Sequence, residues 1–247
     1  MPAIFKAVFL DIDGTLIRPS VGGDENNFTL QFAQELQQWF SEWITQQGCF
    51  SQLPPFWQDA VQGQHQLDWG RVATGIDRLE DAVTHAGADL SSFQDGLAQW
   101  MGRRYREIEG ATELLNVVRR DGRKLYLATA NTSTIALAKL RGTGLDYSRF
   151  DGTCGGLEVV PRGKSSPDFF RCLAQQAGFA PEEILHIGNS PQDDAAFALE
   201  AGLGFCLLLY PGGVIPPLKD RTLDHQRLRV CSTLHEVSQW VQCLSEK

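Results

Sequence analysis

The stretch KAVFLDIDGT, residues 6–15, decides the fold of this chain. Its apolar run AVFL is typical of a buried strand, and Gly14 and Thr15 end that run. Asp11 and Asp13 occupy alternate positions directly after the run, so their carboxylates are expected to point the same way. Burying two like charges together is costly, and open α/β sheets bind ligands at the C-terminal ends of their strands. The stretch therefore predicts a catalytic site at the end of a first strand.

Composition narrows the classes of protein and of partner. At 247 residues, the chain is long enough for one large domain or for one domain with a substantial insert. Its hydrophobic fraction of 43% is normal for a globular protein with a buried core. The net charge of −8 argues against a nucleic-acid or acidic-membrane surface, although it permits a small anionic substrate. No apolar stretch approaches the roughly 20 residues that span a membrane. We therefore expect no nucleic-acid and no membrane partner.

The six cysteines and the N-terminal sequence indicate an intracellular protein. The cysteines form no C-x-x-C pair, and several lie in apolar runs such as FCLLLY. This pattern disfavours a zinc site or a disulfide framework and favours reduced, mostly buried thiols. The N-terminus lacks a basic region followed by a long apolar run, so we expect no signal peptide and a cytoplasmic location.

The chain divides into two parts that differ in composition and in the spacing of apolar residues. Residues 18–106 are rich in Gln, Trp and Phe at helical spacing and contain no convincing strand. Besides a helix around Phe28–Phe40, we expect helices there at 56–65, 68–86 and 91–106. From residue 110, strands and helices alternate. We expect strands at 124–129, 156–160, 184–188, 205–210 and 228–231, and helices at 112–121, 132–142, 167–177, 192–201 and 234–244.

This alternation indicates a parallel, doubly wound sheet. The helical stretch separates the first strand from all the others. We therefore predict a Rossmann-like α/β core with an all-α cap domain inserted after the first strand. The core would comprise residues 1–17 and 108–247, and the cap would comprise residues 18–107.

Two further strand ends carry candidate site residues. Thr129 closes the strand KLYLAT, where a hydroxyl before a helix can bind a phosphate oxygen with help from backbone N–H groups. Taken alone, Thr129 fits equally well as part of a helix cap. Lys164 precedes a helix that begins at Pro167 and is a natural counter-charge for clustered carboxylates and a phosphoryl group. An exposed loop lysine is the alternative, and the glycine spacing of a P-loop is absent.

A fourth motif, GNSPQDD at residues 188–194, follows the strand ILHIG. Asn189 and the acidic pair Asp193 and Asp194 can supply oxygen ligands to Mg²⁺. The acids would also be favourable at the N-terminus of a helix, and the two roles are compatible.

Together, the four motifs resemble those of the haloacid dehalogenase-like hydrolase superfamily, in the same order and structural context. The resemblance covers residues 3–17 and 108–245. The helical insert is similar in position to the cap of phosphoglycolate-phosphatase-like members. The resemblance implies a hydrolase that acts on a small phosphorylated metabolite with Mg²⁺ as its cofactor.

The resemblance also implies roles for single residues. Asp11 matches the nucleophile that forms an aspartyl-phosphate, and Asp13 matches the general acid/base. Thr129 and Lys164 match the phosphate-binding and charge-balancing positions, and Asp194 matches an acid of the metal site. The metal ligands would then be Asp11, Asp13, Asn189 and Asp194.

One departure from the family's pattern lies in this metal site. The family usually has aspartate where this chain has Asn189, which keeps an oxygen ligand but loses a charge. Because the binding of hard cations depends on ligand charge, we expect weaker binding of Mg²⁺, with Asp193 as a candidate to compensate. A catalytically weak regulatory or binding relative is therefore an alternative to an active enzyme.

Asp13 distinguishes between the reactions of the family. A halide leaving group needs no acid, so a second carboxylate favours hydrolysis of a phosphoester. A phosphomutase with the same residues is a further alternative, which differs in how well its cap excludes water. The sequence leaves the substrate and the oligomeric state open, and we expect most of the cap tryptophans to pack helices together.

Overall fold

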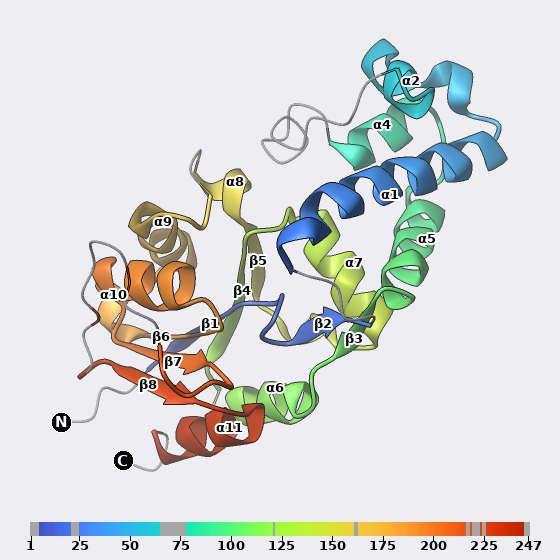
Figure 1. The fold of residues 1–247 in the computed structure, drawn as a ribbon. Coiled ribbons are helices and arrows are strands. Elements are labelled where there is room, and N and C mark those ends of the chain that lie inside the picture. Colours follow the sequence, from blue (N-terminus) through green and yellow to red (C-terminus); the bar gives the residue numbers. More distant parts are fainter. Residues whose placement is uncertain are drawn as a thin grey trace.

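The chain forms an α/β core with a helical cap on one side (Figure 1). The computed structural model describes residues 5–20, 25–64, 78–120, 122–160, 163–215, 218, 223 and 226–244. The predicted fold class is confirmed, because the strands of the core all run parallel and the helical insert follows the first of them.

Six parallel strands form the sheet of the core, in the order β5-β4-β1-β6-β7-β8. These strands are β1 (Ala7–Leu10), β4 (Lys124–Thr129), β5 (Gly152–Gly155), β6 (Ile184–Gly188), β7 (Phe205–Leu209) and β8 (Leu228–Cys231). Because β4 and β6 flank β1 on opposite sides, the sheet has a switch point outside the C-terminal end of β1. Ligands of such sheets bind at that point.

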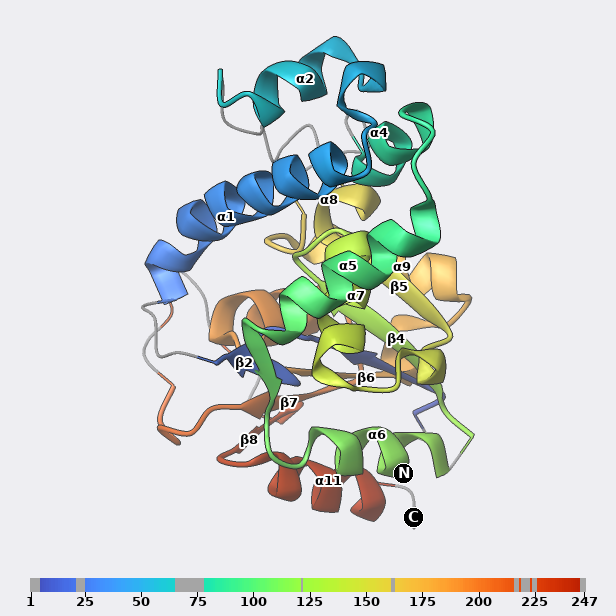
Figure 2. The ribbon, with the colours of Figure 1, turned by 90° about the vertical axis from the view of Figure 1, so that its right-hand side faces the viewer.

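Helices cover both faces of this sheet (Figures 1 and 2). They are α6 (Ala111–Arg120), α7 (Ser133–Thr143) and α11 (Leu234–Cys243) on one face, and α9 (Pro167–Ala177) and α10 (Phe197–Glu200) on the other. Val8 and Leu10 of β1 pack in the buried cluster under α6, α7 and α11, whereas Ala7 and Phe9 pack in the buried cluster under α9 and α10. Successive residues of a strand point to opposite faces, so a strand covered on both sides requires the continuous apolar run of β1.

The insert leaves and re-enters the core through a two-stranded antiparallel ribbon, formed by β2 (Ile17–Pro19) and β3 (Tyr105–Glu107). The helices described in the insert are α1 (Glu25–Gln46), α2 (Pro55–Val61), α4 (Leu79–His85) and α5 (Leu90–Gly102). Arg18 lies opposite Arg106 in the ribbon, so the two ends of the insert are adjacent. Short 3₁₀ turns occupy Phe50–Gln52, Tyr147–Arg149 and Pro181–Glu183.

Aromatic side chains fill the interior of the cap. The Phe93 ring lies edge-on to Trp43, with centroids 5.3 Å apart, and Phe40 packs in the same way on Trp57 at 5.4 Å. Trp39 and Trp100 also pack within this cluster, with their rings tilted by 35° and centroids 5.9 Å apart, whereas Trp69 lies outside the described residues. The same buried cluster continues into the sheet, so cap and core share one hydrophobic interior.

The last cap helix touches the core backbone to backbone where α5 crosses α7. A Cβ added to Gly142 would lie 2.6 Å from the backbone nitrogen of Gly102 and would overlap the carbonyl oxygen of Ala98. Only glycine permits this approach, and it fixes α5 directly on α7.

The predicted strand at 156–160 is wrong. The strand ends at Gly155, and a short helix, α8 (Gly156–Val159), follows it. The Glu158 carboxylate accepts hydrogen bonds from the backbone N–H groups of Gly155 at 3.2 Å and Ser133 at 3.0 Å. This polar contact caps the start of α8 and outweighs the strand-like composition of the segment.

The expectation of no strand within 18–106 is also wrong, because each ribbon strand is too short to show a periodic pattern. The predicted helix at 91–106 ends at Gly102, and the one at 56–65 ends at Val61. Of the predicted helix at 68–86, residues 68–77 lie outside the described part of the chain, and α4 occupies most of the rest. The predicted helix at 192–201 begins as a π-helix, Pro191–Ala196, before α10.

Among the described segments, no helix combines the length and the apolar character that crossing a membrane requires.

Candidate active site

Three neighbouring strands and one loop bring the predicted site residues together. Asp11 and Asp13 follow β1, Thr129 ends β4, and Asn189 follows β6. The three strands are adjacent and parallel, so their C-terminal ends lie at one edge of the sheet. Lys164 reaches this edge from the loop before α9 and contacts Asp11. The structure thus brings these predicted site residues together at one edge of the sheet.

Lys164 joins two buried carboxylates. Its Nζ lies 2.5 Å from Oδ1 of Asp11 and 2.6 Å from Oδ1 of Asp194, and the lysine side chain is only 5% exposed. The Thr15 hydroxyl donates to the other oxygen of Asp11, Oδ2, at 3.2 Å. Asp11 is therefore held at both oxygens beside a fixed positive charge.

Asp194 is held by four groups. Besides Lys164, Nε2 of His186 lies 2.8 Å from its Oδ1, and the backbone N–H groups of Asn189 and Ser190 donate to its Oδ2 at 3.0 and 2.8 Å. Asp194 thus anchors both the lysine and the loop after β6. Because both of its oxygens already accept hydrogen bonds, its role as a metal ligand stays a prediction.

Burial and the shared lysine set the charges of this cluster. Burial, together with Asp194 and Asp13, raises the pKa of Asp11 to about 7 in spite of Lys164. Burial acts the same way on Asp194, but Lys164 and His186 outweigh it and hold the pKa of that carboxyl well below its usual range. Burial lowers the pKa of His186, so a neutral imidazole donates its Nε2–H to Asp194.

The side-chain amide of Asn189 lies against both aspartates of the first motif. One of its two terminal amide atoms lies 3.0 Å from the carbonyl oxygen of Asp13 and 3.3 Å from Oδ2 of Asp11. When this atom is assigned as Nδ2, it donates a hydrogen bond to each of these oxygens. A Cβ at residue 14 would overlap this amide, so Gly14, with φ of 74°, makes the close approach possible.

The oxygen atoms around Asn189 fit the ligand preference of Mg²⁺. When the amide of Asn189 is turned by 180°, its Oδ1, the Asp13 carbonyl and an Asp11 carboxylate oxygen converge, and oxygen is the ligand that Mg²⁺ prefers. Within the described residues, no group of three or more His, Cys, Asp or Glu side chains is arranged to hold a metal. A site for the ion therefore depends on the Asp13 carbonyl and the Asn189 amide.

Asp13 is held by two residues that the sequence analysis did not single out. Lys139 Nζ lies 2.8 Å from Oδ1 and 3.0 Å from Oδ2 of Asp13, and 2.9 Å from Oδ1 of Asn131. Nδ2 of Asn131 donates to Asp13 and, at 2.9 Å, to the Thr129 hydroxyl. The side chain of Lys139 is 4% exposed and that of Asp13 is 41% exposed.

A signal for Lys139 is present in the sequence. The lysine interrupts the apolar helix TIALAKL, in which Ile135, Ala136, Ala138 and Leu140 are all buried. A lysine on a buried helix face requires a partner of opposite charge. Nothing local to the helix identifies that partner, which lies 126 residues away in the sequence.

A groove of about 1020 Å³ reaches the edge of the site at Gly14 and Asn189. Arg18, Tyr210 and His235 also line it, whereas Asp11 and Lys164 do not. Its volume suits a small molecule, so there is room for a ligand next to the Asn189 side of the site.

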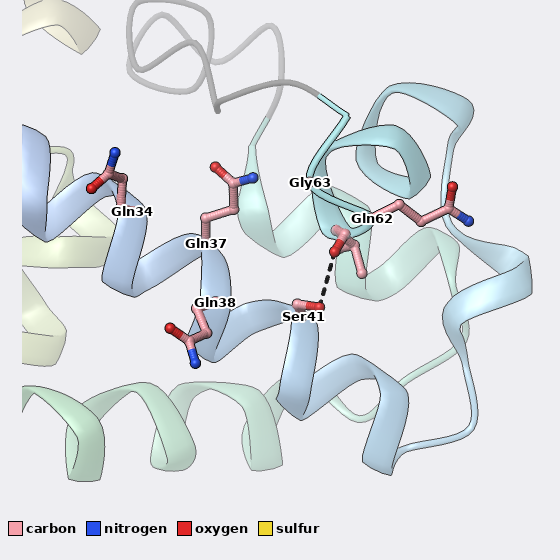
Figure 3. A pocket seen from close by; sticks show the side chains of 7 residues that line it. Gln34, Gln37, Gln38, Ser41, Gln62 and Gly63 are labelled. Carbon is pink, nitrogen blue, oxygen red and sulfur yellow. Dashed lines mark hydrogen bonds between the residues drawn. The ribbon is translucent and has the colours of Figure 1, made fainter.

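A second groove, of about 490 Å³, lies in the cap beside α1 (Figure 3). Ser41 closes one side of it by donating to the carbonyl of Val61 at 3.1 Å. The described residues that line it are Gln34, Gln37, Gln38, Ser41, Val61, Gln62 and Gly63. None of these seven residues is ionisable, so they supply no counter-charge for an anionic group, and the Ser41 hydroxyl has no base among them to activate it. The strand-end site therefore remains the candidate.

Several solved structures have a fold similar to that of this chain. Three solved structures of similar fold are a HAD family hydrolase from Deinococcus radiodurans R1, a HAD phosphatase from Thermococcus onnurineus and a putative beta-phosphoglucomutase from Thermotoga maritima. Each is 20% identical to this chain, with TM-scores of 0.54, 0.55 and 0.53. The matches cover 98%, 96% and 96% of this chain and 97%, 98% and 99% of the respective structures.

No curated protein sequence matches the chain. The family model described as "Hydrolase: haloacid dehalogenase-like hydrolase" matches residues 5–202, which include the strand ends that carry Asp11, Thr129 and Asn189. Since this match covers most of the chain, the protein belongs to the haloacid dehalogenase-like hydrolases.

Proposed function

We propose that the protein is a phosphatase that hydrolyses a small-molecule phosphate monoester through an aspartyl-phosphate intermediate. The observation that carries the proposal is the ion pair between the buried side chains of Asp11 and Lys164. Asp13, two residues after Asp11, adds a second carboxylate that is partly exposed. A fixed nucleophile, a fixed cation and a reachable second carboxylate are what two-step transfer of a phosphoryl group requires.

In the first step, an oxygen of Asp11 attacks phosphorus while the bond to the leaving alcohol breaks. Lys164 offsets the charge that develops on the phosphoryl group. The Thr129 hydroxyl accepts two hydrogen bonds from Asn131, one from its backbone N–H and one from Nδ2. The O–H of Thr129 can therefore donate a hydrogen bond to a phosphoryl oxygen. Asp13 gives a proton to the leaving alcohol, then takes one from the water that attacks the intermediate.

Mg²⁺ would be held by Asp11, the carbonyl of Asp13 and Asn189, with Asp194 as a further predicted ligand. When bound, the ion supplies positive charge that attracts the phosphate dianion to a site rich in carboxylates. The chain's own counter-charge is Lys164. The relatives agree with a phosphatase, since the Deinococcus radiodurans hydrolase contains bound phosphate and the Thermococcus onnurineus protein is described as a phosphatase.

The test is turnover of p-nitrophenyl phosphate with Mg²⁺ by the wild type, by Asp11→Asn and by Asp168→Asn. Asp168 is an exposed aspartate paired with Arg171 and serves as the charge-matched control. We expect release of inorganic phosphate by the wild type and the control, and its loss in Asp11→Asn. Equal, background rates for wild type and Asp11→Asn would refute the proposal and favour the binding or regulatory alternative that Asn189 suggests.

A further inference from the structure

The contacts of Asp13 with Lys139 point to a residue that the proposed mechanism does not yet include. We propose that Lys139 is a positioning residue, which holds the Asp13 carboxylate in the orientation from which it transfers a proton to the leaving oxygen. The inference rests on the proposed phosphatase function and extends it to a residue that contacts no reacting atom.

Lys139 removes the rotational freedom of the Asp13 carboxylate. Its ammonium group contacts both oxygens, at 2.8 and 3.0 Å, so the carboxylate plane cannot turn without breaking a bond. The same ammonium contacts Oδ1 of Asn131, whose Nδ2 bonds to Asp13 and to the hydroxyl of Thr129. This chain of contacts sets the carboxylate relative to the hydroxyl that is proposed to bind phosphate.

The surroundings of Lys139 give its charge few other partners. Its Nζ lies 4.5 Å from the ring centroid of Tyr105 and 5.4 Å from that of Phe32, so two aromatic rings of the insert lie beside it. A buried ammonium without a carboxylate is strongly unfavourable. The ammonium group of Lys139 therefore stays paired with Asp13, whose side chain is 41% exposed and remains accessible from solvent.

Fixed orientation matters for the proton that Asp13 handles. As the P–O bond breaks, its electron pair stays on the leaving oxygen, which takes a proton from Asp13. In the second step, Asp13 takes a proton from water as the water oxygen bonds to phosphorus and the bond to Asp11 breaks. Both transfers require the carboxylate oxygen within hydrogen-bond reach of the other oxygen.

The test compares two leaving groups of similar shape in the wild type, Lys139→Met, Asp13→Asn and the double variant. p-Nitrophenolate leaves readily without a proton, whereas phenolate is more basic and gains more from one. We expect Lys139→Met to lower kcat for phenyl phosphate about tenfold more than kcat for p-nitrophenyl phosphate, with little change in KM. With Asp13→Asn already present, Lys139→Met should cause little further loss, because the group that it positions is gone.

Arg141→Met is the matched control, because it removes another cation of α7, one that pairs with Asp95. This control should retain both activities. If Lys139→Met fails to fold by circular dichroism, Lys139→Gln keeps a donor near Asp13 and enters the same comparison. Equal losses on both esters, or losses that multiply in the double variant, would overturn the positioning role. If the wild type hydrolyses neither ester, the proposed function itself is wrong, and the inference falls with it.

Discussion

Asn189 is a residue whose side chain can either donate a hydrogen bond or provide an oxygen ligand at the same position. With Nδ2 toward Asp13 and Asp11, the amide satisfies two oxygens without any ion. With Oδ1 in that place, three oxygens meet, and a cation is needed between them. The family's usual aspartate can adopt only the second arrangement when ionised.

This difference predicts the behaviour of Asn189→Asp. Without Mg²⁺, the variant adds a further carboxylate beside Asp11 and loses two hydrogen bonds, so we expect it to be less stable than the wild type by about 1–3 kcal/mol. Mg²⁺ should restore the loss and bind the variant more tightly than the wild type. Thermal unfolding in EDTA and in Mg²⁺, with calorimetric titration of the ion, measures both effects.

Gln192→Glu is the control for Asn189→Asp, because it adds the same charge at a nearby exposed position, in the π-helix Pro191–Ala196. Its thermal unfolding should respond to Mg²⁺ as that of the wild type does. A Tm of Asn189→Asp that is insensitive to Mg²⁺ would show that the residue has no part in a metal site.

The raised pKa of Asp11 predicts a pH dependence of stability with a definite sign. The pKa is about 7 in the folded protein and 3.8 in the unfolded chain, so between these values the folded state binds more protons. The contribution of Asp11 to the free energy of unfolding therefore falls as pH rises from about 4 to about 7. Asp11→Asn removes this contribution, so its stability relative to the wild type should increase over that range.

Urea unfolding of wild type and Asp11→Asn at pH 5 and at pH 8, in EDTA, tests this sign. The difference between the two proteins isolates Asp11 from the other titrating groups. A difference that is the same at both pH values would contradict the raised pKa.

Among the single residues of the site, the sequence predicted several groups that stand at strand ends but missed Asn131, just after β4, and Lys139, on α7. Asp11, Thr129 and Asn189 each follow a recognisable strand, and parallel pairing then brings them together. Lys139 lies within a helix, and its partner is fixed only by the packing of α7 against the loop after β1. Its burial was readable from the apolar helix, whereas its contact with Asp13 was not.

Among the helices and strands, α5 and α7 cross in direct backbone contact and so join cap to core. We expect Gly142→Ala to lower the free energy of unfolding by about 1–3 kcal/mol, because the added methyl group would meet the backbone of α5. Chemical denaturation measures this loss. Ser92→Ala, at an exposed position of α5, should leave stability unchanged, and equal stability of Gly142→Ala would contradict the tight crossing.

The elements that the sequence predicted well are those with a strong local pattern. β1, β4 and β6 are apolar runs that end at polar residues, and α7 and α9 end at the turn glycines Gly144 and Gly178. β2 and β3 have three residues each, and they exist because they pair across the whole insert. Local pattern carries no information about such a distant partner.

At the scale of the molecule, one buried cluster extends from the sheet through the cap. We therefore expect cap and core to unfold in a single transition. Five of the six tryptophans lie within residues 18–107, so fluorescence of Trp240→Phe reports on the cap alone, while circular dichroism reports on the whole chain. Coincident urea midpoints are expected, and earlier loss of the fluorescence signal would show that the cap unfolds separately.

The contact of α5 with α7 also limits how the cap can move relative to the core. The ribbon of β2 and β3 joins the cap to the core, and the glycine crossing keeps α5 seated on α7. A cap tied down along this border cannot lift evenly from the sheet edge. Any opening of the cap would therefore be a rotation about this border, with α5 remaining seated on α7.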